Sequence, residues 1–274
     1  MTPKKRRIIL ALCVLIFLLS VPPLLLYTLG YRWNPILGAY KTGGLYISSP
    51  VTGSKIFVNN KEKKQTNIFQ GSLFLQSLKP GKYSILVSKD NYWPWQKNLL
   101  IKEQFVTEAR AMLVPKDPKG KIILRDNYSP LEISKYDEIL TELKTLQLSS
   151  TTPRFTSNQK EKLWWNPKDN KVWVEWLGDR ELLPYFFCDD KLCSDEILIF
   201  NSRSLIRNVD FYPKRKDAVI IAVQNGIYAL EIDGRGERNI QPIYKGKEPI
   251  FTTYKNEGSI YILEEDKLIE IKME

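Results

Sequence analysis

The chain has 274 residues, of which 41 are Lys or Arg, 31 are Asp or Glu, three are Cys and none is His, and its formal net charge is +10 at pH 7. The lack of His excludes a Ser-His-Asp triad, a Cys-His pair and any zinc or haem site that depends on an imidazole ligand. An enzyme would have to use carboxylates, Lys, Tyr or a metal site without His. The hydrophobic fraction of 43% is that of a folded chain.

The N-terminus combines a basic run, Lys4, Lys5, Arg6 and Arg7, with an uncharged apolar stretch from Ile8 to Gly30. As a helix, this stretch is long enough to cross a bilayer core, which needs about 20 residues. Basic residues before a span stay on the cytoplasmic side. The sequence therefore predicts a cytoplasmic tail at 1–7, a single transmembrane anchor at 8–30 and an extracytoplasmic bulk in the cell envelope.

A cleaved signal peptide is the competing interpretation of this segment. Signal peptides have a shorter apolar region, of about 7–15 residues, and a small-x-small cleavage site. Ser20-Val21-Pro22 is the nearest candidate for such a site, and its Pro is unfavourable. Tyr27, Tyr31 and Trp33 follow the apolar stretch where an interfacial aromatic belt is expected, so an uncleaved anchor is favoured. Pro22-Pro23 predicts a kink in the helix.

A linker is expected at 31–43, and residues 44–115 then read as strands separated by Pro- and Gly-containing turns. About seven short strands in so short a segment favour a small β-sandwich. The fold class expected for the chain is mainly β, with one N-terminal helix. The expected strands include Leu45–Ser48, Lys55–Val58, Leu73–Leu78, Tyr83–Ser88, Leu99–Ile101 and Val106–Val114.

Three segments of this region resemble the PEGA domain family: Gly44 to Val58 with its Ser-Pro-Val-Thr-Gly turn, Leu78-Lys-Pro-Gly-Lys-Tyr83, and Val87 to Trp95. Asn91 stands where the family commonly has Gly before the aromatic residue, and Asn59-Asn60 stands at another common Gly position; Asn tolerates the left-handed conformation that such positions need. The resemblance implies an envelope-exposed β-sandwich over 44–115, and it carries no catalytic residues.

Residues 116–274 contain a different pattern. A short strand is expected at Ile122–Leu124 and a helix at Ser134–Leu148, with Ile139, Leu140, Leu143 and Leu146 on one face. Trp164 to Val174 then resembles Asp210 to Ile220, and later strand pairs recur with a period of about 40–45 residues, which is typical of propeller blades. A closed propeller needs about four to eight blades. Further blades within 116–160, a partial stack and completion by another copy all remain open.

Cys13 lies in the apolar stretch, whereas Cys188 and Cys193 bracket a short acidic loop. In an oxidising extracytoplasmic compartment this spacing favours a disulfide across a hairpin tip. Two free thiols or a metal-binding pair are the alternatives. Zinc is disfavoured because neither His nor a second Cys pair is available.

Tyr92, Trp93 and Trp95 form the candidate ligand-binding set, because flat aromatic faces stack on sugar rings. The competing interpretation is that these rings cap the sandwich core; it is favoured for Tyr92 and Trp95, and Trp93 is expected to be the exposed ring. Among Trp164, Trp165, Trp173 and Trp176, a packing role is favoured for most, with Trp173 on the face opposite Val172 and Val174.

Acidic residues offer weaker candidates. Asp189, Asp190, Asp195 and Glu196 have no EF-hand spacing, so a solvated loop is favoured over a calcium site. Asp210, Asp217, Glu231 and Asp233 could supply a carboxylate pair for glycoside hydrolysis, but the sequence selects no pair. Phosphate-binding and nucleophile motifs are lacking from the sequence, which favours no cofactor, no metal and no catalytic residue.

These observations predict a non-catalytic, single-span envelope protein that presents a PEGA-like domain and β-repeats for binding or scaffolding. A cell-wall glycan or an envelope protein is the expected partner, and a nucleic-acid partner is not expected. The alternatives are an extracytoplasmic glycan hydrolase with paired carboxylates and a sensor that signals through a membrane partner, since the short tail contains no signalling domain.

Overall fold

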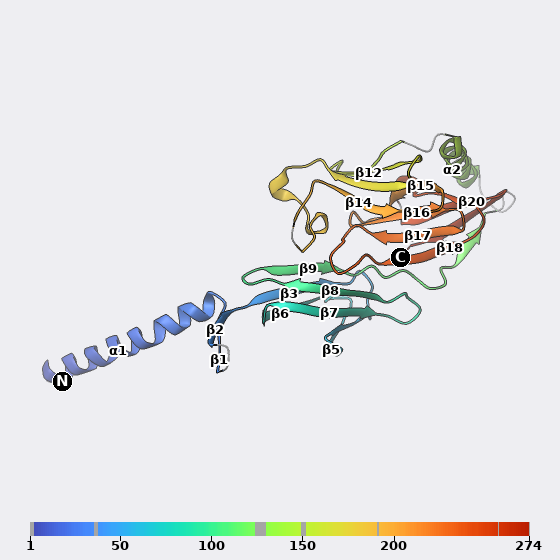
Figure 1. Ribbon diagram of the computed structural model, residues 1–274. Helices are drawn as coiled ribbons and strands as arrows, with labels where there is room; N and C mark the ends of the chain where they lie inside the picture. The colour runs from blue at the N-terminus through green and yellow to red at the C-terminus, as the bar shows by residue number, and fades with distance from the viewer. Residues whose placement is uncertain are drawn as a thin grey trace. The chain divides into compact units, whose positions relative to one another are not determined.

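The computed structural model describes residues 3–35, 38–123, 130–148, 152–190, 192–256 and 258–273, and these form a mainly β protein with one N-terminal apolar helix (Figure 1). Contacts between residues divide the chain into two compact units. One comprises Met1–Ser48, Ser72–Tyr83 and Leu99–Ala109, and the other comprises Ser49–Gly71, Ser84–Asn98 and Arg110–Glu274. The predicted domain boundaries at 43/44 and 115/116 differ from this division and stay a prediction.

The N-terminal helix α1 (Pro3–Thr28) is long and apolar enough to cross a membrane. None of its described side chains is buried, and its first turns carry the basic run from Lys4 to Arg7. The helix continues through Pro22 and Pro23 and begins before the predicted start at Ile8. An apolar helix without a protein partner exposes its side chains to solvent unless lipid surrounds it.

The first unit continues from α1 into short antiparallel strands. The predicted linker forms a two-stranded hairpin, in which Tyr31 lies opposite Lys41 and Asn34 lies opposite Gly38. A three-stranded sheet follows, in the order β6-β3-β9. The bounds of these strands are β1 Tyr31–Asn34, β2 Gly38–Lys41, β3 Gly43–Ser48, β6 Ser72–Leu78 and β9 Val106–Arg110.

A four-stranded sheet has the order β5-β4-β7-β8, with β4 at Lys55–Val58, β5 at Lys61–Gln65, β7 at Gly81–Ser88 and β8 at Trp95–Ile101. Its buried residues alternate with exposed ones along the strands, as in β8, where Trp95, Lys97, Leu99 and Ile101 are buried. The turn after β4 uses Asn59 and Asn60 at φ of 49° and 63°, the left-handed conformation expected of Asn at these positions.

The C-terminal part of the second unit contains three four-stranded antiparallel sheets, in the orders β11-β12-β13-β14, β15-β16-β17-β18 and β10-β21-β20-β19. The third sheet takes β10 from a segment well before its other strands, with Gly120 opposite Ile271. Among the described strands, no sheet closes into a barrel or a propeller. The strand bounds are β10 Gly120–Ile122, β11 Arg154–Phe155, β12 Glu161–Asn166, β13 Lys171–Trp176, β14 Glu196–Asn201, β15 Ile206–Phe211, β16 Ala218–Val223, β17 Gly226–Glu231, β18 Ile240–Lys245, β19 Ile250–Thr252, β20 Ser259–Glu264 and β21 Lys267–Lys272.

Buried and exposed positions alternate along β12 and β13, and this alternation determines which face each Trp residue lies on. Trp165 is buried in a core shared with the β15–β18 sheet, whereas Trp164 and Trp173 lie on the other face, directly opposite each other. Their rings stack at 5.9 Å between centroids with an interplanar angle of 12°. Trp173 thus lies on the face opposite Val172 and Val174, as the strand alternation predicts.

Helix α2 (Pro130–Leu148) covers the third sheet, and its buried face carries Ile139, Leu143 and Leu146. These side chains pack against Ile250, Tyr254, Tyr261 and Leu268. The apolar stripe predicted from Ile139, Leu140, Leu143 and Leu146 is therefore the stripe that packs, with Leu140 partly buried at its side.

Candidate functional site: a cationic cavity beside a buried ionic network

The three aromatic residues of the predicted binding set do not form one exposed surface. Trp95 is fully buried, whereas Tyr92 and Trp93 are half-buried. Lys89 lies 5.3 Å from the centroid of the Tyr92 ring, and Lys116 lies 5.6 Å from that of Trp93. A ring without exposed surface cannot stack on a ligand, so Trp95 has the packing role that the sequence favours for it.

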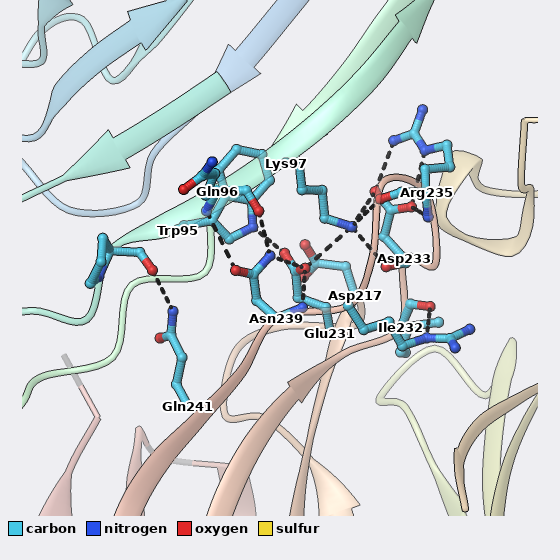
Figure 2. Close-up of polar contacts among 12 residues, drawn as sticks. Trp95, Gln96, Lys97, Asp217, Glu231, Ile232, Asp233, Arg235, Asn239 and Gln241 are labelled. Carbon is cyan, nitrogen blue, oxygen red and sulfur yellow. Dashed lines mark hydrogen bonds and ion pairs between the residues drawn. The ribbon is translucent and has the colours of Figure 1, made fainter. Parts of the chain in front are cut away.

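Trp95 belongs to a buried ionic network (Figure 2). Its indole Nε1 donates to Glu231, the last residue of β17. The Nζ of Lys97 lies 3.3 Å from Glu231 Oε2 and 3.4 Å from Asp233 Oδ2, and it donates to the carbonyl oxygens of Asp233 and Arg235. Residues 95–97 of β8 are in this way joined to the segment that follows β17.

Amides complete the network. The side-chain nitrogen of Asn239 donates to Glu231 Oε2 at 2.9 Å and to the Gln96 carbonyl at 3.2 Å. Gln241 donates to the Pro94 carbonyl and accepts from the amide of Val114. Gly236, at φ 57°, lets the turn approach closely, because a Cβ there would lie 2.2 Å from the Asn98 carbonyl oxygen.

The charges of this network are matched within the protein. Burial raises the pKa of Glu231, although the Lys97 ammonium and the bonds from Asn239 and Trp95 oppose that shift. Asp233 is held by Arg235, whose Nε and Nη2 donate to its two carboxylate oxygens at 3.0 and 2.9 Å. Because each charged group faces a protein partner, the arrangement is suited to joining segments of the chain rather than to binding a ligand.

The carboxylate of Asp217 is also paired with a cation of the protein. Arg215 donates to both of its oxygens, at 2.9 and 2.6 Å, and also to the Ala111 carbonyl. Burial alone would raise the pKa of Asp217, but the charge of Arg215 and its hydrogen bonds outweigh burial and lower it. Of the four carboxylates that could have formed a hydrolytic pair, three are therefore paired inside the protein, and Asp210 is the remaining one.

Asp210 lines a cavity of about 710 Å³ where short elements of the second unit converge. β11 contributes Arg154, β15 contributes Asp210, α2 contributes Glu142, and the segment after β19 contributes Thr253. These elements are far apart in the sequence, so the cavity is a product of the fold. Its lining comprises Arg110, Glu142, Pro153, Arg154, Phe155, Thr156, Ser157, Asn158, Asp210, Phe211, Lys214, Arg215, Lys216, Thr252, Thr253, Tyr254 and Lys255.

The cavity wall is cationic, with six Arg or Lys side chains and two carboxylates, a formal excess of four positive charges. Arg215 and Arg110 share Asp217, and Lys216 lies 4.0 Å from Glu161. The guanidinium of Arg154 makes no hydrogen bond or ion pair to any residue within the described ranges. The charge of Arg154 acts on the buried carboxyl of Asp210, and Lys255 lies 3.9 Å from Glu138 Oε2.

The two carboxylates of the cavity each accept a hydrogen bond from Thr. Thr253 donates to Asp210 Oδ2 and Thr252 donates to Glu142 Oε1, both at 2.6 Å. Burial raises the pKa of Asp210, while the bond from Thr253 and the charge of Arg154 act in the opposite direction. Glu142 was not identified from the sequence, because its helical segment gives no sign of which distant strands it faces.

The acidic hairpin tip contains a disulfide between Cys188 and Cys193, while Cys13 is free in α1. Asp189 accepts from the Leu192 amide at 2.6 Å, which holds the loop in a turn. Among the residues that the structure describes, no cluster of three or more Cys, Asp or Glu side chains is arranged to hold a metal ion.

No protein-family model matches the chain, and no curated protein sequence matches it. One solved structure that it resembles is a Bacteroides fragilis protein of unknown function that is described as membrane-associated. The sequence identity is 11%, the TM-score is 0.22, and the match covers 85% of this chain and 94% of the other. A likeness at this level carries no argument about shared fold or function, so the PEGA resemblance stays a prediction.

Proposed function

We propose that the chain is a non-catalytic binding protein of the cell envelope, held by α1 in the membrane, and that its cationic cavity binds an anionic glycan or wall polymer. The observation that carries the proposal is the cavity itself, where six cationic side chains surround two carboxylates. Phosphate and carboxylate groups are the ligands that Arg and Lys recognise through charge-assisted hydrogen bonds. Thr and Asn side chains in the lining suit the hydroxyl groups of a polyol or sugar.

The proposal also includes an assignment of the two β regions to known architectures. Residues 44–115 are taken as a PEGA-like sandwich and residues 116–274 as propeller-like repeats. The order of strands in two of the three C-terminal sheets, and of β19, β20 and β21 in the third, supports the second interpretation, because successive strands lie side by side as they do in a propeller blade.

Membrane topology is also part of the proposal. The apolar helix and the basic run from Lys4 to Arg7 support a cytoplasmic N-terminus with the rest of the chain outside. A wall polymer would then be accessible to the cavity without crossing the membrane.

The test is direct binding to the full chain in lipid nanodiscs by isothermal titration calorimetry. The probes are an oligomer of poly(glycerol phosphate), an oligogalacturonate and a neutral maltooligosaccharide. We expect one or both anionic probes to bind, with affinity that falls as salt rises, and the neutral probe not to bind. Equal binding of neutral and anionic probes, or none by any, would overturn the proposal.

A glycan hydrolase is the second candidate, and one observation favours it. Asp210 and Glu142 line the same cavity, and burial raises the pKa of Asp210, the direction that a general acid requires. Release of new reducing ends from the same anionic probes, abolished in Asp210→Asn and in Glu142→Gln, would establish this activity instead of simple binding.

A further inference from the structure

Large apolar side chains are exposed beside the end of α1, in the first unit. Trp33 is 77% exposed, Phe105 is 68% exposed and Val106 is 50% exposed. Trp33 lies in β1, five residues after the helix, whereas Phe105 and Val106 come from the loop between β8 and β9 and the start of β9. Large apolar groups that are exposed near the end of an apolar helix suggest a surface that contacts another apolar phase.

Hydrogen bonds join the β8–β9 loop to the chain that leaves the helix. The amide of Gln104 donates to the Thr42 carbonyl at 2.8 Å, and the amide of Gly44 donates to the Phe105 carbonyl at 2.9 Å. Thr42 in turn donates from its amide to the carbonyl of Gly30, two residues beyond the end of α1, at 2.9 Å. Each such step joins chains roughly 5 Å apart, so the β8–β9 loop lies on the order of 10 Å from the helix end.

Lysines outnumber acids at the same edge of the first unit. Lys102 and the acidic Glu103 begin the β8–β9 loop and are exposed, and Lys41 donates from its Nζ to the Gln104 side chain at 3.1 Å. Lys79 is exposed just after Leu78, which lies opposite Gly43 at the end of β3 nearest to α1. Aromatic residues among lysines are the composition of a surface that meets anionic lipid headgroups.

Arg32 adds a fixed positive charge. Its guanidinium lies 3.7 Å from the centroid of the Tyr27 ring and donates to the Tyr27 carbonyl and to Ser77 Oγ. A hollow of about 410 Å³ lies beside it, lined by Arg32, Phe74 and Phe105 among others. The hollow combines a cationic wall with aromatic edges, as the headgroup and upper acyl region of a phospholipid require.

We infer that the edge of the first unit formed by Trp33, Lys102, Phe105 and Val106 lies in the headgroup region of the bilayer that α1 spans. This inference rests on the anchoring in the proposed function and deepens it, because it gives the membrane a second contact with the protein. The interfacial layer adds about 5–8 Å to each side of the hydrocarbon core, a thickness of the same order as the spacing between the helix end and the β8–β9 loop. The lysines make the contact stronger on anionic lipid.

The test uses the full chain, with Cys13→Ser and the Cys188–Cys193 bond intact, reconstituted in vesicles. Either Phe105→Cys or Glu103→Cys is labelled with the environment-sensitive fluorophore NBD, and Ser72→Cys is the matched control. Ser72 lies at the opposite end of β6 from Leu78, about 20 Å away at the rise of a strand. The vesicles contain phosphatidylcholine alone or an equal mixture with phosphatidylglycerol, each with and without a lipid that carries a nitroxide quencher near its headgroup.

We expect a blue-shifted emission and strong quenching at positions 103 and 105, greater with phosphatidylglycerol, and little quenching at position 72. Quenching at 103 and 105 no greater than at 72 would overturn the inference, and quenching indifferent to phosphatidylglycerol would overturn the role of the lysines. Alkaline carbonate separates the two proposals. Release of the chain from vesicles would overturn the anchoring, whereas a retained chain with unquenched probes would overturn the lipid contact alone.

Discussion

Lys97 and Glu231 form a salt bridge of 3.3 Å with side-chain exposures of 0% and 3%. The two residues join strand β8 to the end of β17, and Asp233 shares the ammonium. A buried ion pair is weak evidence of net stabilisation, but loss of one partner leaves an uncompensated charge in a low-dielectric site. The network therefore fixes how these segments meet.

Lys97→Met should lower the free energy of unfolding by about 3–5 kcal/mol, because Glu231 and Asp233 would lose their shared cation. Lys97→Met combined with Glu231→Gln should recover part of that loss. Denaturant unfolding of the full chain in detergent measures both effects. Lys61→Met is the control, since Lys61 is exposed on β5; an equal loss in Lys61→Met would contradict the assignment.

The buried carboxyl of Asp210 should make the free energy of unfolding depend on pH, and the sign of that dependence follows from its pKa shift. Burial raises its folded pKa above the unfolded value of about 3.9. Between these two values the folded state holds more protons, so the contribution of Asp210 to stability falls as pH rises through that window. Asp210→Asn should accordingly gain stability relative to the wild type from pH 4 towards neutrality.

Thermal unfolding of the wild type and of Asp210→Asn across this pH range measures the effect. Asp217→Asn is the opposite control, because Arg215 lowers the pKa of Asp217, and the stability that this carboxylate contributes is present above its unfolded pKa and lost as pH falls. Parallel pH curves for both variants would refute the assigned environments.

The Cys188–Cys193 disulfide closes a short loop, with a sequence separation of five residues. The chain-entropy relation gives about 2 kcal/mol for so short a loop. A reducing agent should lower the free energy of unfolding of the wild type by about this amount and leave the Cys188→Ser, Cys193→Ser variant unchanged. A reductant effect of equal size in the double variant would exclude the disulfide as its cause.

The basic run should set the orientation of α1. Replacing Lys4, Lys5, Arg6 and Arg7 by Gln removes the charges that hold the N-terminus in the cytoplasm, and a fraction of chains should insert the other way. Protease digestion of intact spheroplasts with a C-terminal epitope tag reports this fraction. Full digestion of the tag in both the wild type and the variant would show that the charges do not determine orientation.

Local patterns in the sequence predict much of this fold. The uncharged stretch from Ile8 to Gly30 predicts α1, and the spacing of Ile139, Leu140, Leu143 and Leu146 predicts α2. Alternation predicts that Trp173 faces away from Val172 and Val174. These features follow from periodicity within one element. The hairpin of β1 and β2 was not predicted, because apolar and polar residues do not alternate clearly in this segment.

Pairings between distant segments could not be predicted. The pairing of Gly120 with Ile271 joins ends of a long segment, and no local signal specifies it. The cavity was missed for the same reason, since Glu142, Arg154 and Asp210 come from a helix and two strands. Trp95 was ranked as a ligand-binding candidate because an exposed and a buried ring have the same sequence signature, whereas its contact with Glu231 depends on the folded chain.

The most direct test of the account compares two charge reversals in the full chain in nanodiscs. Arg154→Glu places a negative charge in the cavity, whereas Arg203→Glu makes the same change at an exposed position outside its lining. A charge-assisted hydrogen bond contributes about 1.5–3 kcal/mol, so Arg154→Glu should weaken binding of the better anionic probe at least about tenfold. Arg203→Glu should leave the affinity within about twofold, because exposed charges are screened by salt. Equal losses in both variants, or no loss in Arg154→Glu, would contradict the cavity as the binding site.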